Sequence, residues 1–131
     1  MSASTSKKVY TVDGSGFTTL AECAAEFTQV LGLTVPWTGN LDAFNDFLNG
    51  GFGTPDQGFI LRWQHSDFSR QRLGYEETLR WLEERFHRCH PSNVARIQQR
   101  IAAARRQEGK TLFDELVEIV REDEDIELRL E

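Results

Sequence analysis

The spacing of apolar and polar residues predicts short strands that alternate with helices. The run "VYTV" (9–12) is rich in β-branched and aromatic residues, and the turn sequence "DGSG" follows it. In "TTLAECAAEFTQVLG" (18–32) apolar residues recur at helical spacing, and Thr19 and Glu22 are spaced as in a capping box. Gly32 suits the end of this helix.

A second helix is predicted from Leu41 to about Asn49. Asn40 is placed to cap its first turn, and the pair Gly50-Gly51 suits its end. The next run, "GFILRW" (58–63), is largely apolar, which predicts a strand buried on both faces. The segment "SDFSRQRLG" (66–74) is expected to form a short helix and a turn.

The second half of the chain is predicted to be mainly helical. Pro91 separates two stretches with helical apolar stripes, and Thr111 with Asp114 resembles a capping box for the last helix. Strands separated by helices indicate an α/β sandwich with a small parallel sheet. The expected elements are helices at 75–89, from 94 to near 109 and from 111 to about 122, and a half-buried strand in the alternating run "IELRLE" (126–131).

Length and composition predict a single domain. The chain has 131 residues, of which 39% are hydrophobic, including nine Phe and three Trp, so a real core can form. Residues 1–8 are polar and are expected to be a disordered tail, which leaves 9–131 as the domain. No apolar stretch reaches the length of a signal sequence or a membrane span. Cys23 and Cys89 lack disulfide-framework spacing, which is typical of reduced thiols in a cytoplasmic protein.

Charge is distributed in three blocks along the chain. The net charge is −6, which argues against a nucleic-acid-binding surface in the protein as a whole. Residues 9–61 contain six acidic residues and no Lys, Arg or His, residues 62–110 carry a net +5, and residues 111–131 carry a net −7. If the two acidic ends meet in the fold, they form one acidic surface.

The predicted second helix has an unusual polar face. Asp42, Asn45, Asp46 and Asn49 lie opposite the apolar stripe, with no basic residue beside them in sequence. Like charges four residues apart cost a few tenths of a kcal/mol, and Asn is a poor helix former. This face gives up local stability, which indicates that a partner uses it, although a merely solvated face is the alternative.

Other candidate chemistry is weaker. The cluster "HRCH" (87–90) lacks a second, spaced pair of metal ligands, and "GSG" (14–16) lacks the third glycine of a nucleotide-binding fingerprint. Asp42 and Asp46 are a possible acid–base pair, but both lie on one helix face rather than on different elements of a cleft. We therefore expect no metal, no cofactor and no enzymatic activity.

The polar helix resembles a known family. "GNLDAFNDFLNGG" (39–51) is similar to the signature of barstar, the intracellular inhibitor of the ribonuclease barnase, and "LGLTVPW", "GFILRW" and "TLFDELVEIV…IELRL" extend the resemblance. It covers the chain from about Lys8, except for about 74–109, which barstar lacks in this length. The resemblance implies a three-stranded parallel sheet packed by helices, with 74–109 as a helical insertion. It also implies that the second helix and its leading loop plug the active site of a nuclease.

The resemblance also assigns roles to residues. Asn40, Asp42 and Asp46 fall on family contact positions, with Asp46 as the principal anchor in place of a phosphate. Asn45 and Gly51 stand where the family has tryptophans. Pro36 replaces an aromatic contact that Trp37 can supply instead. The expected partner-binding set is Trp37, Asn40, Asp42, Asn45, Asp46, Asn49, Gly50 and Glu118.

The function that follows is inhibition of a basic ribonuclease. A ribonuclease cleft is lined with cations that bind phosphate, so a protein that fills it must present carboxylates. We expect a cytoplasmic immunity protein, a monomer when free, which forms a 1:1 complex with an extracellular-type ribonuclease or RNase toxin. Neither nucleic acid nor a membrane is expected as a partner.

Two other classes stay open at this point. A non-inhibitory regulatory module would use the basic segment 75–109 and would bind RNA at moderate salt. A small enzyme would show a bell-shaped pH–rate profile that is lost in Asp46→Asn.

Overall fold

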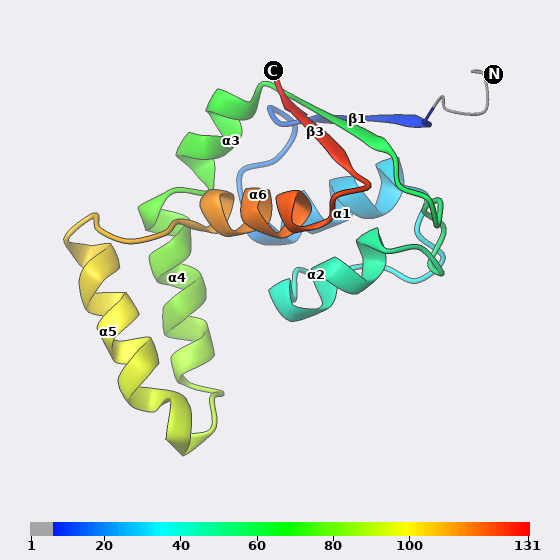
Figure 1. Ribbon diagram of the computed structural model, residues 1–131. Helices are drawn as coiled ribbons and strands as arrows, with labels where there is room; N and C mark the ends of the chain where they lie inside the picture. The colour runs from blue at the N-terminus through cyan, green and yellow to red at the C-terminus, as the bar shows by residue number, and fades with distance from the viewer. Residues whose placement is uncertain (1–6) are drawn as a thin grey trace.

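The protein is built on a three-stranded parallel sheet, which confirms the predicted fold class. The computed structural model describes residues 7–131, so residues 1–6 of the predicted tail lie outside it, while the carbonyl of Lys8 already accepts from the N–H of Ile60 at 2.8 Å. Strand β2 is central and pairs in parallel with both neighbours. The strands are β1 (Val9–Asp13), β2 (Ile60–Gln64) and β3 (Glu127–Leu130) (Figure 1).

Helices cover only one face of this sheet. Every second strand residue points into the core, among them Val12 and Trp63, which are neighbours across β1 and β2. On the opposite face the side chain of Arg62 remains 38% exposed and forms an ion pair with Glu131 at 2.8 Å. The prediction that β2 is buried on both faces is therefore wrong, because this face of the sheet carries polar side chains such as Arg62, and no helix within residues 7–131 covers it.

Three helices provide the other wall of the main core. They are α1 (Leu20–Val30), α2 (Leu41–Leu48) and α6 (Leu112–Glu122). Phe27 of α1 is fully buried, and its ring lies 6.1 Å from Trp37, 5.6 Å from Phe44 and 5.3 Å from Trp63. Edge-to-face contacts of this kind favour one arrangement of the rings. The aromatic cluster thereby fixes α2 against α1 and the sheet.

The remaining helices follow β2. They are α3 (Ser66–Arg72), α4 (Tyr75–Phe86), the short 3₁₀ helix η2 (Pro91–Asn93) and α5 (Val94–Arg105). Helices α4 and α5 form a hairpin, here called the arm, that extends away from the sheet (Figure 1). The arm has a small core of its own, made of Leu82, Ile97, Ile101 and Ala104. Within residues 7–131, no helix is long and apolar enough to span a membrane.

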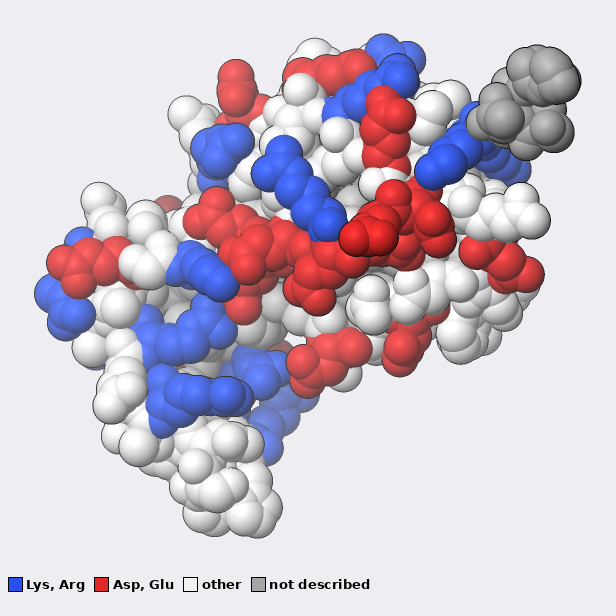
Figure 2. All heavy atoms as spheres, in the orientation of Figure 1, with Lys and Arg blue, Asp and Glu red and all other residues white. Residues whose placement is uncertain are grey.

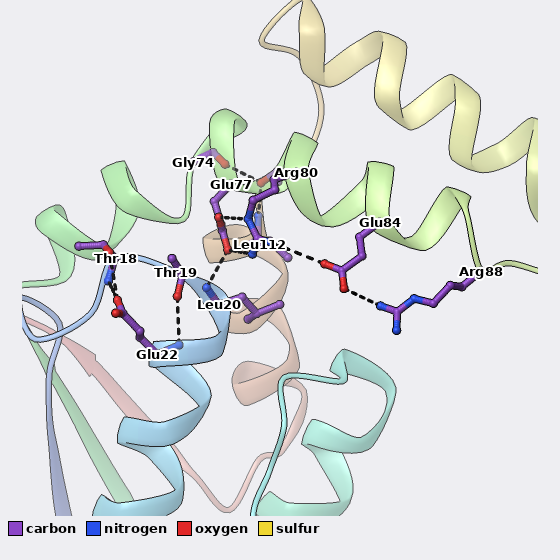
Figure 3. A network of polar contacts seen from close by, with 11 residues as sticks. Thr18, Thr19, Leu20, Glu22, Gly74, Glu77, Arg80, Glu84, Arg88 and Leu112 are labelled. Atoms are coloured by element: carbon purple, nitrogen blue, oxygen red, sulfur yellow. Dashed lines mark hydrogen bonds and ion pairs between the residues drawn. The ribbon is translucent and has the colours of Figure 1, made fainter.

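Two buried polar contacts attach the arm to the body (Figure 3). The carboxylate of Glu77, only 7% exposed, accepts from the backbone N–H of Leu20 at 2.8 Å and from Arg80. The hydroxyl of Thr78 accepts from the N–H of Leu112 at 2.9 Å. Residues of α4 thus satisfy orphan donors at the first residues of α1 and α6, which holds α4 in a defined position.

Local caps explain where the helices begin. Thr111 and Asp114 form both bonds of the predicted capping box. At α1 the hydroxyl of Thr19 accepts from the N–H of Glu22, as expected, but the carboxylate of Glu22 returns to the N–H of Thr18 instead of Thr19. The N–H of Thr18 lowers the pKa of Glu22 most, and its hydroxyl adds to the effect.

Candidate functional site

The candidate site is centred on α2, whose position is fixed from both ends. At its start the amide oxygen of Asn40 accepts from the N–H of Asp42 at 2.9 Å, as the sequence predicted for a cap. At its end the hydroxyl of Thr54 donates to the carbonyl of Phe47 at 2.9 Å. Leu41, Phe44 and Leu48 are buried against the core. The opposite face of α2 is therefore presented on a rigid support.

The loop after α2 depends on glycine. Gly50 has a φ of +94°, which L side chains rarely adopt, and a Cβ at this position would collide with the carboxylate of Asp56. Gly50 consequently keeps the end of α2 close to the following loop. This gives the predicted helix-end glycine a structural reason, independent of any partner.

Trp37 was predicted to contact the partner, but it is buried. Its side chain is 3% exposed, it stacks on Phe44 with ring centroids 4.3 Å apart, and its indole N–H donates to the carbonyl of Asn40 at 2.8 Å. The ring is therefore a core group that supports the cap of α2, and it does not lie on the surface. The prediction failed because Trp37 is one residue beyond the exposed Pro36 and points to the opposite side of the chain.

The two acidic ends of the sequence meet in the fold. Helix α2 packs against α6, and the turn between α6 and β3 brings a run of four acids beside the exposed face of α2. Acidic side chains gather over α2, along α6 and at this turn, while basic side chains gather over α4 and α5 (Figure 2). A cavity of about 450 Å³ lies between the two elements and is lined by Asn45, Asn49, Glu122, Asp123, Glu124 and Asp125. We call α2 and this turn together the acidic surface.

The charges of the acidic surface differ in how far they are neutralised. Asp42 and Asp46 are exposed, and no Lys, Arg or His within residues 7–131 forms an ion pair with either of them. Glu118 is different, because the ammonium of Lys110 lies 2.9 Å from its carboxylate. The hydrogen bond to Glu118 raises the pKa of Lys110. Glu118, on α6, therefore borders the acidic surface as a paired charge.

The turn after α6 contributes residues that were not predicted individually. Glu122, Asp123, Glu124 and Asp125 were recognised in the sequence only as part of an acidic C-terminal block. The side chain of Asp123 holds this turn, because its carboxylate accepts from the N–H of Asp125 at 2.9 Å. The signal that identifies them is the unbroken run of four acids at the end of the last predicted helix.

The other motifs do not form a chemical centre. His90 accepts from the N–H of Ser92 and so caps η2, and His87 is exposed at the end of α4. In the part of the chain that the structure describes, no cluster of three or more His, Cys, Asp or Glu side chains is arranged to hold a metal. Cys23 is buried, and burial raises the pKa of its thiol. The chemistry of the site therefore lies in its exposed carboxylates and amides.

The fold is a small α/β domain that presents a capped, packed helix whose carboxylates form no ion pair within residues 7–131. The family model described as Barstar (barnase inhibitor) matches residues 7–94, which include β1, α1, all of α2, β2 and α4. The chain belongs to this family, as its sequence predicted. A search of the curated proteins found no match.

Proposed function

We propose that this chain is an inhibitor of a basic ribonuclease, and that it acts by covering the active site with α2 and the acidic surface. The single observation that carries the proposal is that Asp42 and Asp46 are exposed on a capped, packed helix within the family match and form no ion pair within residues 7–131. The target is an extracellular-type ribonuclease or an RNase toxin. The inhibitor works in the cytoplasm as a 1:1 partner, and it protects the cell that makes it.

The inhibitory step is a substitution of carboxylates for phosphates. A ribonuclease stabilises its polyanionic substrate with Arg, Lys and His, and these groups accept a carboxylate in the same place. Asp46, in the middle of the exposed face, is the main anchor, and Asp42 lies one turn before it. Asn40, Asn45 and Asn49 supply amides around them. Because α2 is already capped and packed, binding requires little ordering of the helix.

The rest of the acidic surface accelerates the association with the ribonuclease. Complementary fields accelerate the association of oppositely charged proteins, and salt screens this effect. The negative field extends beyond α2 over Glu122 to Asp125. Gly50 and Glu118 lie at the border of the acidic surface. Trp37 holds the cap of α2 from inside the core. We also propose that residues 9–131 act as one domain in which the arm, within 74–109, is an insertion.

The proposal is tested by titrating ribonuclease activity. Proteins secreted by the source organism are passed over a cation exchanger, and the retained ribonuclease is assayed with and without the purified chain, with barnase as a second enzyme. We expect cleavage of RNA to end at one equivalent of the chain, with an association rate that falls steeply as salt rises. Retained ribonucleases that all remain fully active at a tenfold excess of the chain would refute the proposal.

A further inference from the structure

A second groove lies on the other side of α2, between its leading segment and the arm. Its volume is about 780 Å³. One wall contains Thr38, Gly39 and Asn40, together with the first residues of α1. The opposite wall is α4 and the residues directly after it, which contribute Arg80, Trp81, Glu84, Arg85 and Arg88. We call this the arginine groove.

The arginine groove has an excess of positive charge. Glu84 is held from both sides, by Arg88 at 2.8 Å and by Arg80 at 3.5 Å, and Figure 3 shows these side chains on the side of α4 that faces α2. Arg85 lies over the ring of Trp81 at 4.9 Å and forms no ion pair within residues 7–131. Arg80 is also paired with the buried Glu77, so three guanidinium groups share two carboxylates and the groove keeps one excess positive charge, that of Arg85. Part of their hydrogen-bonding capacity is free for an anionic ligand.

The arginine groove adjoins the acidic surface directly. Asn40 lines the groove and also caps α2. Asp42 of the acidic surface lies only two residues after Asn40. Figure 2 shows the same transition, with basic side chains over the arm next to acidic side chains over α2 and α6. A protein seated on α2 therefore lies across the mouth of the groove, and it meets a surface whose charge changes sign.

We propose that the arginine groove binds an acidic segment of the same ribonuclease that α2 inhibits. This inference rests on the proposed function and adds a second recognition element to it. The partner it fits has a cationic cleft bordered by a loop that carries Asp or Glu side chains. The carboxylates of that loop pair with Arg85 and Arg88, and its chain occupies the space between α4 and the segment 38–40.

The distribution of charge favours a short acidic loop over other ligands. An RNA strand would extend beyond the groove onto the acidic surface, where its phosphates are repelled. A second copy of this chain would bring the acidic surface to the groove, but each copy carries a net charge of −6. A loop attached to a cationic protein has neither disadvantage, because the rest of the partner is attracted to α2 at the same time.

The arginine groove thereby selects among ribonucleases. An enzyme with a basic cleft but no acidic rim binds to α2 and leaves the excess positive charge of the arginine groove facing its own cations. Opposed like charges at an interface disfavour the wrong partner. The arm therefore narrows the range of enzymes that the acidic helix alone would accept.

The test compares two charge-matched variants of the full chain. Arg85→Glu/Arg88→Glu reverses the charge of the groove, and Arg96→Glu/Arg106→Glu makes the same change in net charge on α5 and the residue directly after it, outside the groove. Affinity for the ribonuclease that the wild-type chain inhibits is measured by calorimetry, with urea midpoints to verify folding. We expect the groove variant to bind about 10- to 100-fold more weakly and the control to remain within about threefold of wild type.

The alternative outcomes are distinguishable. Equal affinities for the two charge-reversal variants, with Asp46→Asn still impaired, would overturn the groove and leave the proposed function intact. A wild-type chain that inhibits no ribonuclease would overturn both. Binding of a labelled single-stranded RNA that is lost only in the groove variant would assign the groove to nucleic acid instead. Self-association in sedimentation experiments that is lost only in that variant would assign it to a second copy.

Discussion

The attachment of the arm depends on one buried carboxylate, and its removal has a calculable cost. Glu77→Ala takes away the acceptor of the Leu20 N–H, a buried bond of 2.8 Å, and releases Arg80. A buried donor without a partner costs about 1 to 3 kcal/mol. The guanidinium of Arg80 is 54% exposed, so the ion pair itself adds at most about 1 kcal/mol. We expect a loss of about 2 to 3 kcal/mol in the free energy of unfolding.

The assay is urea unfolding, with Glu76→Ala as the matched control. With a slope of about 2 kcal/mol per molar, the midpoint of Glu77→Ala falls by roughly 1 to 1.5 M. Glu76 is the exposed neighbour on the same helix, so its replacement should shift the midpoint by no more than about 0.25 M, which corresponds to 0.5 kcal/mol.

The effect should also depend on pH. Burial acts to raise the pKa of Glu77, but the hydrogen bond from Arg80, the N–H of Leu20 and the charge of Arg80 outweigh it and hold the pKa below its ordinary value of 4.5. Because the folded pKa is the lower one, the ionised carboxylate stabilises the fold above about pH 4.5, and this contribution disappears as the pH falls through the folded pKa. The difference between Glu77→Ala and wild type should therefore shrink in acid. Equal midpoints for Glu77→Ala and Glu76→Ala at pH 7 would refute this account of the arm.

Three further predictions concern the core, the acidic turn and the thiols. Phe27→Ala removes the central ring of the aromatic cluster and should lower the free energy of unfolding by about 3 to 5 kcal/mol in urea titrations. Gly58 has a φ of +89°, and a Cβ there would collide with the carbonyl of Asp125, so Gly58→Ala should cost about 1 to 3 kcal/mol and also weaken binding through the acidic turn. A thiol reagent should modify Cys89 in the native protein and reach the buried Cys23 only after unfolding. Reaction of both thiols under native conditions would contradict the burial of Cys23.

Much of the fold follows from local patterns in the sequence. The apolar stripe of α2, its cap at Asn40 and the capping box of Thr111 with Asp114 depend on residues within a few positions of one another. Periodicity and capping chemistry carry that information directly. The acidic surface was also predictable, because the two acidic blocks are long. The last strand joins the same sheet as the first two strands, which brings the C-terminal block back to the N-terminal one.

Features that depend on long-range packing were not predictable. The apolar run of β2 does not reveal that its second face carries Arg62 toward solvent, since periodicity cannot show which side the helices cover. Trp37 is adjacent to a surface helix, and its burial depends on contacts with Phe27 and Phe44. The arginine groove exists because Glu77 binds Leu20, a residue 57 positions away in the sequence. Local sequence patterns do not predict a contact between residues so far apart in the chain.

The central claim is that the exposed carboxylates of α2 serve a partner and not the fold. Asp46→Asn keeps the size of the side chain and removes the repulsion with Asp42, which is worth a few tenths of a kcal/mol on a helix surface. Removal of one partner from a desolvated charge pair costs about 3 kcal/mol or more, which corresponds to roughly 100-fold in affinity. Asp67→Asn on α3 is the control, because Asp67 is also exposed but lies outside the acidic surface.

The most direct measurement is therefore the urea midpoint and the ribonuclease affinity of Asp46→Asn, compared with the wild-type chain and Asp67→Asn. We predict a midpoint equal to or slightly above wild type, together with binding at least about 100-fold weaker, while Asp67→Asn keeps full affinity. A lower midpoint with unchanged affinity would contradict the claim, because it would make Asp46 a structural residue on a face that no partner uses.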